Sequence, residues 1–123
     1  MNLYLAIDGG GTGCRAALSD GSGRILGSVR GTQRDGTCEV GRLVVLPEAQ
    51  GRGIGRALTI ALEDRFPSAE RFELFTGDHE GAALHIYRSL GYVPFRVQPV
   101  TGGLRLVYLE KRRCGEKGYT GGG

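Results

Sequence analysis

The sequence predicts an α/β protein (α+β) in which a mixed, mostly antiparallel sheet carries two helices and is preceded by a three-stranded antiparallel meander. Two observations predict this fold. Three short β-prone segments, with turn-forming glycines between them, come before residue 30. From residue 38 onward, apolar spacing changes between the strand and the helix period in the order β-α-β-α-β-β. A chain of 123 residues has room for one modest core, so residues 1–123 are predicted to form a single domain.

The meander is predicted from residues 3–8, 14–19 and 24–29, which have the composition of short strands. Residues 20–23, Asp-Gly-Ser-Gly, are a strong hairpin signal because glycine tolerates the positive φ that tight turns need. The polar, turn-rich residues 30–37 are predicted to form a loop, a seam between the meander and the rest of the chain.

The second part begins with a strand at about 38–46, whose last four residues are a continuous apolar run that favours burial on both faces. A helix is predicted from Ile54, with apolar residues four, seven and eight positions later. Pro67 should stop this helix, because the residue before a proline avoids the α region. The remaining predicted elements are a strand at 71–75, a helix at 81–90 followed by Gly91 as its C-cap, and strands at 93–97 and 104–109.

Composition and charge exclude several classes of protein. The chain contains 23 Gly but only 4 Pro and no Gly-x-y period, so its glycines are interpreted as turns and close backbone approaches and not as collagen. A net charge of +3 suits an anionic ligand and is too weak to indicate nucleic acid. No apolar run approaches the length of a membrane span and no signal peptide is visible, so neither a membrane nor secretion is expected.

The cysteines and the basic end of the chain complete this picture. Cys14, Cys38 and Cys114 are odd in number and form no C-x-x-C pair, so neither a metal site nor a disulfide framework is expected. A reducing, cytoplasmic location fits this cysteine usage better. Residues 112–123 are predicted to be a basic, Gly-rich, flexible tail, and the cluster at 111–113 is interpreted as a solvated end.

The stretch after residue 46 has the physical properties of an anion site. A buried strand leads directly into a glycine-rich turn that opens a helix, and Gly51, Gly53 and Gly55 leave backbone N–H groups uncovered by side chains. The positive end of the helix dipole, with Arg52 and Arg56, adds favourable potential at the same place. A pyrophosphate would fit such a site. The spacing matches neither a Walker loop, which needs Gly-Lys-[Ser/Thr], nor a Rossmann turn.

These residues resemble a known family. The run Leu46-Pro47-Glu48-Ala49-Gln50-Gly51-Arg52-Gly53-Ile54-Gly55-Arg56-Ala57 is similar to the acetyl-CoA motif of the GNAT superfamily of N-acetyltransferases, whose core is [Arg/Gln]-x-x-Gly-x-[Gly/Ala]. Downstream, residues 83–92 resemble the second family block, A-x-x-x-Y-x-x-x-G-[FY]. The resemblance covers residues 38–111. It implies a GNAT-like sheet that binds acetyl-CoA through the backbone of Leu43, Val44 and Val45 and through Gln50, Gly51, Arg52, Gly53, Ile54, Gly55 and Arg56.

The resemblance also implies a reaction, which is direct transfer of an acetyl group to the amine of a small molecule or peptide. Tyr87 matches the tyrosine that protonates the departing CoA thiolate, and Glu39 matches the carboxylate that deprotonates the amine in some members. Each residue also has a structural alternative. Tyr87 would serve equally well as a core aromatic side chain on the inner stripe of its helix, and Glu39 as an ordinary carboxylate at the end of a strand.

The first 37 residues do not resemble the usual start of that family. They resemble the opening of an actin-like ATPase or sugar kinase of the N-acetylglucosamine kinase and BadF type, on Asp8, Gly10 and Thr12. Residues 1–37 are therefore predicted to differ in origin from the cofactor-binding half at 38–111, as in a chimera. Two alternatives to an acetyltransferase follow: a non-catalytic chimera with at most a CoA-binding surface, and a phosphate- or nucleotide-binding fragment. Pairing of two chains through sheet edges would complete the sheet as a homodimer.

Overall fold

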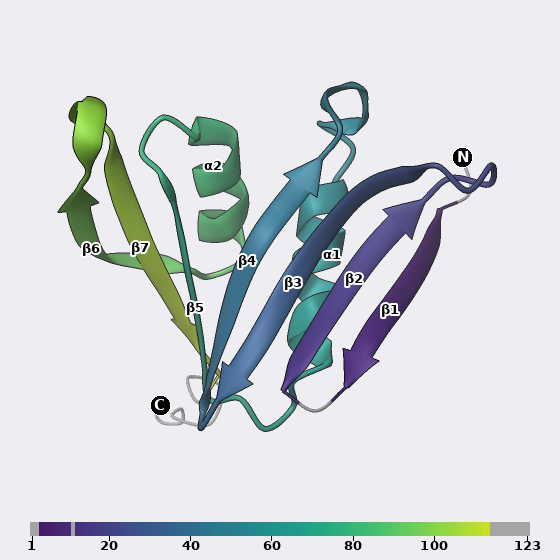
Figure 1. Ribbon diagram of the computed structural model, residues 1–123, viewed down its shortest axis with the longest axis horizontal. Helices are drawn as coiled ribbons and strands as arrows, with labels where there is room; N and C mark the ends of the chain where they lie inside the picture. The colour runs from purple at the N-terminus through teal and green to yellow at the C-terminus, as the bar shows by residue number, and fades with distance from the viewer. Residues whose placement is uncertain (1–2, 11, 114–123) are drawn as a thin grey trace.

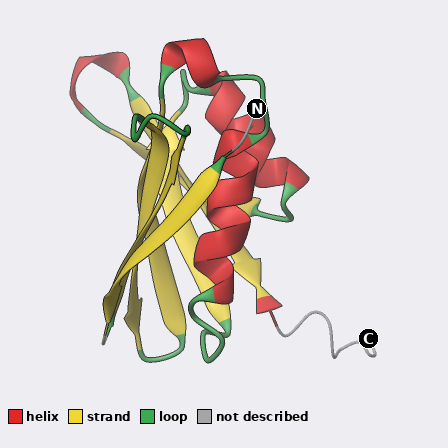
Figure 2. Ribbon diagram, turned by 90° about the vertical axis from the view of Figure 1, so that its right-hand side faces the viewer, coloured by secondary structure: helices red, strands yellow, loops and turns green. Residues whose placement is uncertain are grey.

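The computed structural model describes residues 3–10 and 12–113, which form one seven-stranded sheet with two α-helices on the same side of it (Figures 1 and 2). The strand order is β1-β2-β3-β4-β5-β7-β6. In chain order the elements are β1 (Tyr4–Gly10), β2 (Gly13–Ser19), β3 (Ile25–Arg34), β4 (Thr37–Val45), η1 (Pro47–Ala49), α1 (Ile54–Asp64), β5 (Arg71–Gly77), α2 (Gly81–Ser89), β6 (Val93–Pro99), η2 (Thr101–Gly103) and β7 (Arg105–Arg112). The predicted mixed sheet with two helices after a three-stranded meander is confirmed.

The predicted loop at 30–37 is wrong. Strand β3 continues through Arg34, and only Asp35 and Gly36 turn the chain back into β4. Turn-forming composition in this stretch is outweighed by pairing, because β3 lies between β2 and β4 and bonds to both. Gly31 is buried here for a packing reason: a Cβ at this position would lie 2.9 Å from the Phe66 ring and 3.0 Å from Leu62. The meander therefore continues into β4 with no seam.

All strand pairs are antiparallel except β4 with β5, and this parallel pair is short. Its register holds only from Thr37 opposite Arg71 to Glu39 opposite Glu73. Beyond that point β4 stays bonded to β3 while β5 stays bonded to β7, so the two strands diverge. Figure 1 shows them meeting at the bottom and separating upward, with α2 visible between them. We call the opening between residues 40–45 and 74–77 the fork.

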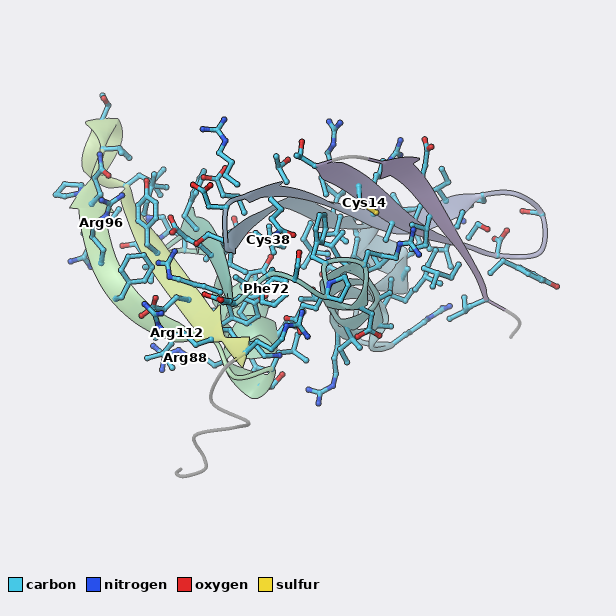
Figure 3. The ribbon with its side chains drawn as sticks, turned by 90° about the horizontal axis from the view of Figure 1, so that it is seen from below. Cys14, Cys38, Phe72, Arg88, Arg96 and Arg112 are labelled. Carbon is cyan, nitrogen blue, oxygen red and sulfur yellow. The ribbon has the colours of Figure 1, made fainter. Side chains whose placement is uncertain are left out.

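The core lies between the sheet and α1. Ile54, Leu58 and Leu62 recur at helical spacing and are each no more than 2% exposed. They pack mainly on β2, β3 and β4, the strands that α1 contacts. Cys38 and Phe72, from the parallel pair, lie in the same interior (Figure 3). Helix α2 packs beside α1, so that both helices cover one face of the sheet and leave the other face bare.

At the end of β7, Lys111 and Arg113 are bonded to the rest of the fold, so the interpretation of residues 111–113 as a solvated end is wrong for these two residues. Lys111 Nζ donates to the Glu63 carboxylate at 2.9 Å. The Arg113 guanidinium donates to the carbonyls of Glu63, Phe66 and Ala69, which end α1 and the turn after it. Helix C-terminal carbonyls lack intrahelical partners, so a cation is favoured there. Residues 114–123 of the predicted tail, with Cys114, lie outside the described residues.

No helix in the described part of the chain is long and apolar enough to cross a membrane.

Candidate functional site

The glycine loop that connects β4 to α1 is built on backbone conformations that favour glycine. Gly51 and Gly53 have φ angles of 81° and 80°, in the left-handed region that other residues rarely adopt. A Cβ placed on either residue would have no atom within 4 Å, so both backbones face open space. The loop therefore offers main-chain groups that a ligand can approach closely.

The first turn of α1 provides donors at the head of this loop. Gly53 is the N-cap residue, no side chain caps the helix, and no acidic residue lies in its first turn. The first intrahelical bond runs from the Ala57 amide to the Gly53 carbonyl at 2.9 Å, which leaves the amides of residues 54–56 without intrahelical partners. Uncapped amides with the positive helix dipole and no acidic residue in the first turn favour an anion.

The side chains around this turn pack in the core or bond to neighbouring elements. Ile54 is 2% exposed and belongs to the core, so only its backbone can contact a ligand. A Cβ on Gly55 would lie 3.2 Å from Ile86 and 3.7 Å from both Leu43 and Val45, so this glycine lets α1 approach β4 and α2 closely. Arg56 is exposed and donates to the Ser89 hydroxyl at 2.9 Å, which ties α1 to α2.

The end of β4 forms one edge of the fork. Leu43 and Val45 point toward α1, whereas Val44 is 57% exposed on the opposite face. Gln50 donates to the Val45 carbonyl at 3.2 Å and so ties the loop to the strand. Arg30 pairs with Gly41 and Ser28 with Val44, so the β4 backbone carries one extra residue, a β-bulge, at residues 42–43.

The predicted pyrophosphate-loop residues therefore come together in space. Those with exposed backbone or side chains at the head of the fork are Gln50, Gly51, Arg52, Gly53 and Arg56, while Leu43, Val45, Ile54 and Gly55 form the close packing beneath them. This arrangement is the one that sequence reasoning expects of an anion-binding turn.

Tyr87 lies on the helix side of the sheet. Its ring is 6% exposed and packs at 5.8 Å, centroid to centroid, against Tyr92. Burial raises the pKa of Tyr87 to about 12, so the phenol stays protonated at neutral pH.

Glu39 lies on the other face of the sheet, at the point where the fork begins. It is exposed and stands opposite Glu73 in the parallel register. Glu73 accepts from Arg71 at 2.5 Å, and Arg71 also donates to Glu110 at 2.6 Å. Within the part of the chain that the structure describes, the Glu39 side chain has no hydrogen bond or ion pair, so its carboxylate is available to a ligand. The structure thus separates Tyr87 and Glu39, one on each face.

Sequence reasoning missed the aromatic residues beside Glu39. Phe75 pairs with Tyr108 across β5 and β7, with ring centroids 5.4 Å apart. Both line, with Glu39 and Glu73, a concave region of about 1130 Å³ on the helix-free face. One signal was present: Phe75 falls on the same strand phase as the polar Arg71 and Glu73, and an apolar residue there has no core to face.

No group of three or more His, Cys, Asp or Glu side chains that could hold a metal occurs among the described residues. Cys14 and Cys38 are both free thiols.

Comparisons with known proteins agree with this geometry. The family model described as "Acetyltransferase (GNAT) family" matches residues 3–92. The mycothiol acetyltransferase of Tsukamurella paurometabola is 40% identical over 97 residues, which are 73% of this chain and 31% of that protein. The chain thus spans about a third of that relative. The matched residues include β1, β2 and β3, so the first strands align within the family domain.

Solved structures share the fold. Nourseothricin acetyltransferase superposes with a TM-score of 0.75 at 21% identity, covering 82% of this chain and 65% of that one. The Escherichia coli ribosomal-protein-S18-alanine N-acetyltransferase gives 0.74 at 21%, covering 85% and 71%. The Salmonella typhimurium protein yncA, solved with its cofactor acetyl-CoA, gives 0.70 at 22%, covering 81% and 64%. Acetyl-CoA is the cofactor that the matched family uses. The protein described here belongs to the GNAT family of acetyltransferases.

Proposed function

We propose that this chain binds acetyl-CoA at the head of the fork and transfers its acetyl group to an amine by direct attack. The proposal depends on one observation: the first turn of α1 is uncapped and follows two glycines with positive φ, Gly51 and Gly53, at the end of the fork where β4 and β5 have diverged. Backbone amides of residues 51–56 would hold the diphosphate, with Arg52 and Arg56 adding positive potential. When bound, acetyl-CoA supplies an acetyl thioester.

The fork fits the arm that follows the diphosphate. Residues 40–45 of β4 have no partner from β5, and six residues of extended strand span about 20 Å. An unpaired strand edge offers amides and carbonyls that an extended, amide-bearing pantetheine arm can bond like an added strand. The thiol end would then lie near the closed end of the fork, beside Glu39.

The two faces of the sheet support two separate proton transfers. On the helix-free face, the unpaired Glu39 carboxylate would take a proton from the attacking amine, directly or through water. As the new C–N bond forms and the C–S bond breaks, the leaving thiolate would take a proton from the Tyr87 hydroxyl on the helix side. The raised pKa of Tyr87 keeps that proton in place until it is needed.

Calorimetry with acetyl-CoA and with ATP tests the binding half of the proposal. Acetyl-CoA should bind and ATP should bind at least tenfold more weakly. Stronger binding of ATP would favour the nucleotide-binding alternative, through Asp8, Gly10 and Thr12. In the structure Gly10 pairs with Gly13 in the register of the β1–β2 hairpin, which does not require a phosphate role. Asp8→Ala should therefore leave acetyl-CoA binding intact.

A thiol-release assay across a panel of small-molecule and peptide amines tests the catalytic half. Release that depends on the amine supports a transferase. Acetyl-CoA binding without amine-dependent release would favour the alternative of a domain that binds CoA without turnover. A separate origin of residues 1–37 and a reducing, cytoplasmic location stay predictions.

A homodimer through sheet edges also stays a prediction, and β1 is the edge to test. Leu3, Tyr4 and Leu5 are each between 42% and 53% exposed there. Apolar residues on an open edge favour pairing with another strand. Sedimentation of the wild type and of Leu5→Lys would show whether this edge holds two chains together.

A further inference from the structure

On the helix-free face, acidic and aromatic side chains lie together beside the closed end of the fork. They are Glu39 on β4, Glu73 and Phe75 on β5, and Tyr108 on β7, and we call them the aromatic–acidic wall. Glu39 and Glu73 stand opposite each other, and Phe75 stands opposite Tyr108 one side-chain step further along the same face. The two carboxylates and the two rings are therefore neighbours around one end of the concavity.

The rings of this wall differ in what already covers them. The Arg96 guanidinium lies 4.0 Å from the centroid of the Tyr108 ring. Phe95, next to the wall, has the Arg71 guanidinium 5.2 Å from its ring centroid. Phe75 is 59% exposed, and no cation among the described residues stacks on it. Phe75 is thus the open ring of the cluster.

The carboxylates differ in the same way. Glu73 shares the Arg71 cation with Glu110, so its charge is partly compensated, whereas the Glu39 carboxylate has no partner in the described residues. An open carboxylate beside an open aromatic face attracts a cation with an apolar body, since the ring quadrupole and the negative charge act together. Unbound amines are mostly protonated at neutral pH, so they arrive as such cations.

We propose that the aromatic–acidic wall is the acceptor subsite and that the acceptor is a cationic primary amine carried on an apolar, flat body. This inference rests on the proposed acetyltransferase function. The ammonium group would lie at Glu39, with Glu73 adding weaker negative potential, and the apolar body would lie on Phe75. The bound ammonium then gives one proton to Glu39, which passes it to water and can take the second proton as the nitrogen attacks. The nitrogen points toward the closed end of the fork.

Two arginines line the same concavity on the strands next to the wall. Arg30 on β3 pairs with Gly41, two residues from Glu39, and Arg15 on β2 pairs with Arg30, with Asp8 opposite Arg15. An acceptor with an anionic group would be drawn toward these arginines, whereas a cationic amine would be drawn toward Glu39 and Glu73. Acceptors of opposite charge therefore discriminate between the arginines and the carboxylates.

The test compares three amines in the thiol-release assay: 2-phenylethylamine, ethanolamine and O-phosphoethanolamine. The value of kcat/KM should be at least about tenfold higher for 2-phenylethylamine than for ethanolamine, and lowest for O-phosphoethanolamine. Phe75→Thr keeps a β-prone residue on an exposed strand position and should lower the 2-phenylethylamine value about tenfold, through KM. The same variant should lower ethanolamine turnover far less, because ethanolamine has no apolar body to lie on Phe75. Tyr4→Thr, another exposed aromatic residue on a strand but far along the sheet, should change neither.

A binding measurement keeps the inference testable without turnover. Saturation-transfer NMR on the CoA-loaded protein should show contact with the 2-phenylethylamine ring in the wild type and much less in Phe75→Thr. Equal turnover and equal contact for all three amines, or a preference for O-phosphoethanolamine, would overturn the subsite while leaving acetyl-CoA binding in place. Failure to bind acetyl-CoA would instead remove the proposed function itself. A dimer that Phe75→Thr converts to monomer would show that a second copy covers the wall, and the subsite would be wrong.

Discussion

Replacing Gly53 by alanine separates a loop that binds phosphate from a loop that merely turns. Gly53 has a φ of 80° and no atom within 4 Å of an added Cβ, so Gly53→Ala introduces backbone strain and no steric clash. Gly102, in the β6–β7 connection away from the glycine loop (Figure 1), has a φ of 82° and the same open surroundings. Gly102→Ala is therefore a matched control for the strain.

The expected magnitudes follow from that match. A left-handed alanine costs about 1–2 kcal/mol, and for a domain of this size each kcal/mol lowers Tm by roughly 3–6 °C. Both variants should lose about the same Tm. Only at Gly53 does relief of the strain rotate an amide that faces the proposed diphosphate, and losing one charge-assisted hydrogen bond costs about 1.5–3 kcal/mol. The Kd for acetyl-CoA should therefore rise about 10- to 100-fold in Gly53→Ala.

Calorimetric titration with acetyl-CoA, alongside thermal melts of both variants, provides the measurement. Gly102→Ala should keep its Kd within about twofold of the wild type. If the two variants lose similar Tm and both bind acetyl-CoA as the wild type does, the amides of this loop do not hold the coenzyme. The anion-site reasoning would then be refuted, whatever the catalytic outcome.

Three further outcomes are expected. Tyr87→Phe should lower kcat about 100-fold while leaving the Kd for acetyl-CoA unchanged, and wild-type activity should show no loss from Tyr87 ionisation below about pH 11, because its pKa is raised to about 12. Glu63→Gln, which replaces the buried acceptor of Lys111 at 2.9 Å, should cost about 2–3 kcal/mol in urea denaturation, whereas Glu48→Gln, in an exposed pair, should change stability by less than about 0.5 kcal/mol. Burial raises the pKa of the Cys38 thiol from 9.0 to about 12, so the stability that the neutral thiol contributes is complete below pH 9 and is lost as pH rises toward 12. Cys38→Ala should lower the free energy of unfolding overall but flatten its decline between pH 9 and 12 by about 1.4 kcal/mol per pH unit. An unchanged slope of stability against pH would contradict this.

The elements that sequence reasoning predicted correctly are those whose signals are local. The α1 periodicity at Ile54, Leu58 and Leu62 identifies its buried face, and Gly91, with a φ of 99°, ends α2 as expected of a left-handed cap. The exposed glycine turn after β4 was predictable because the conformation of a tight turn depends on a few consecutive residues, whereas its role in binding an anion stays a proposal. In each case the neighbours along the chain decide the conformation.

The features that were predicted wrongly or not predicted depend on contacts between residues that are distant in sequence. Arg113 was expected in a solvated tail, yet its guanidinium bonds to the carbonyls that end α1, about 50 positions earlier in the chain. Gly31 lies in a stretch with the composition of a loop, but it is buried in β3, where Leu62 and Phe66 occupy the space that a side chain would need. Phe75 and Tyr108 become one surface only through the β5–β7 register. None of these partners can be read from the residue's own neighbourhood.

The bulge in β4 links the two halves of the proposed site. Before it, Cys38 and Val40 face the core while Glu39 faces the open side, as the strand period requires. Without an extra residue at 42–43, that period would place Leu43 and Val45 on the open face beside Glu39. With it, both lie 3.7 Å from the Cβ position of Gly55, under the first turn of α1, and Val44 faces the concavity instead. One inserted residue thus lets a single strand present Glu39 to the proposed acceptor side and pack against the proposed phosphate-binding turn on the other face, because it shifts the side-chain phase between them.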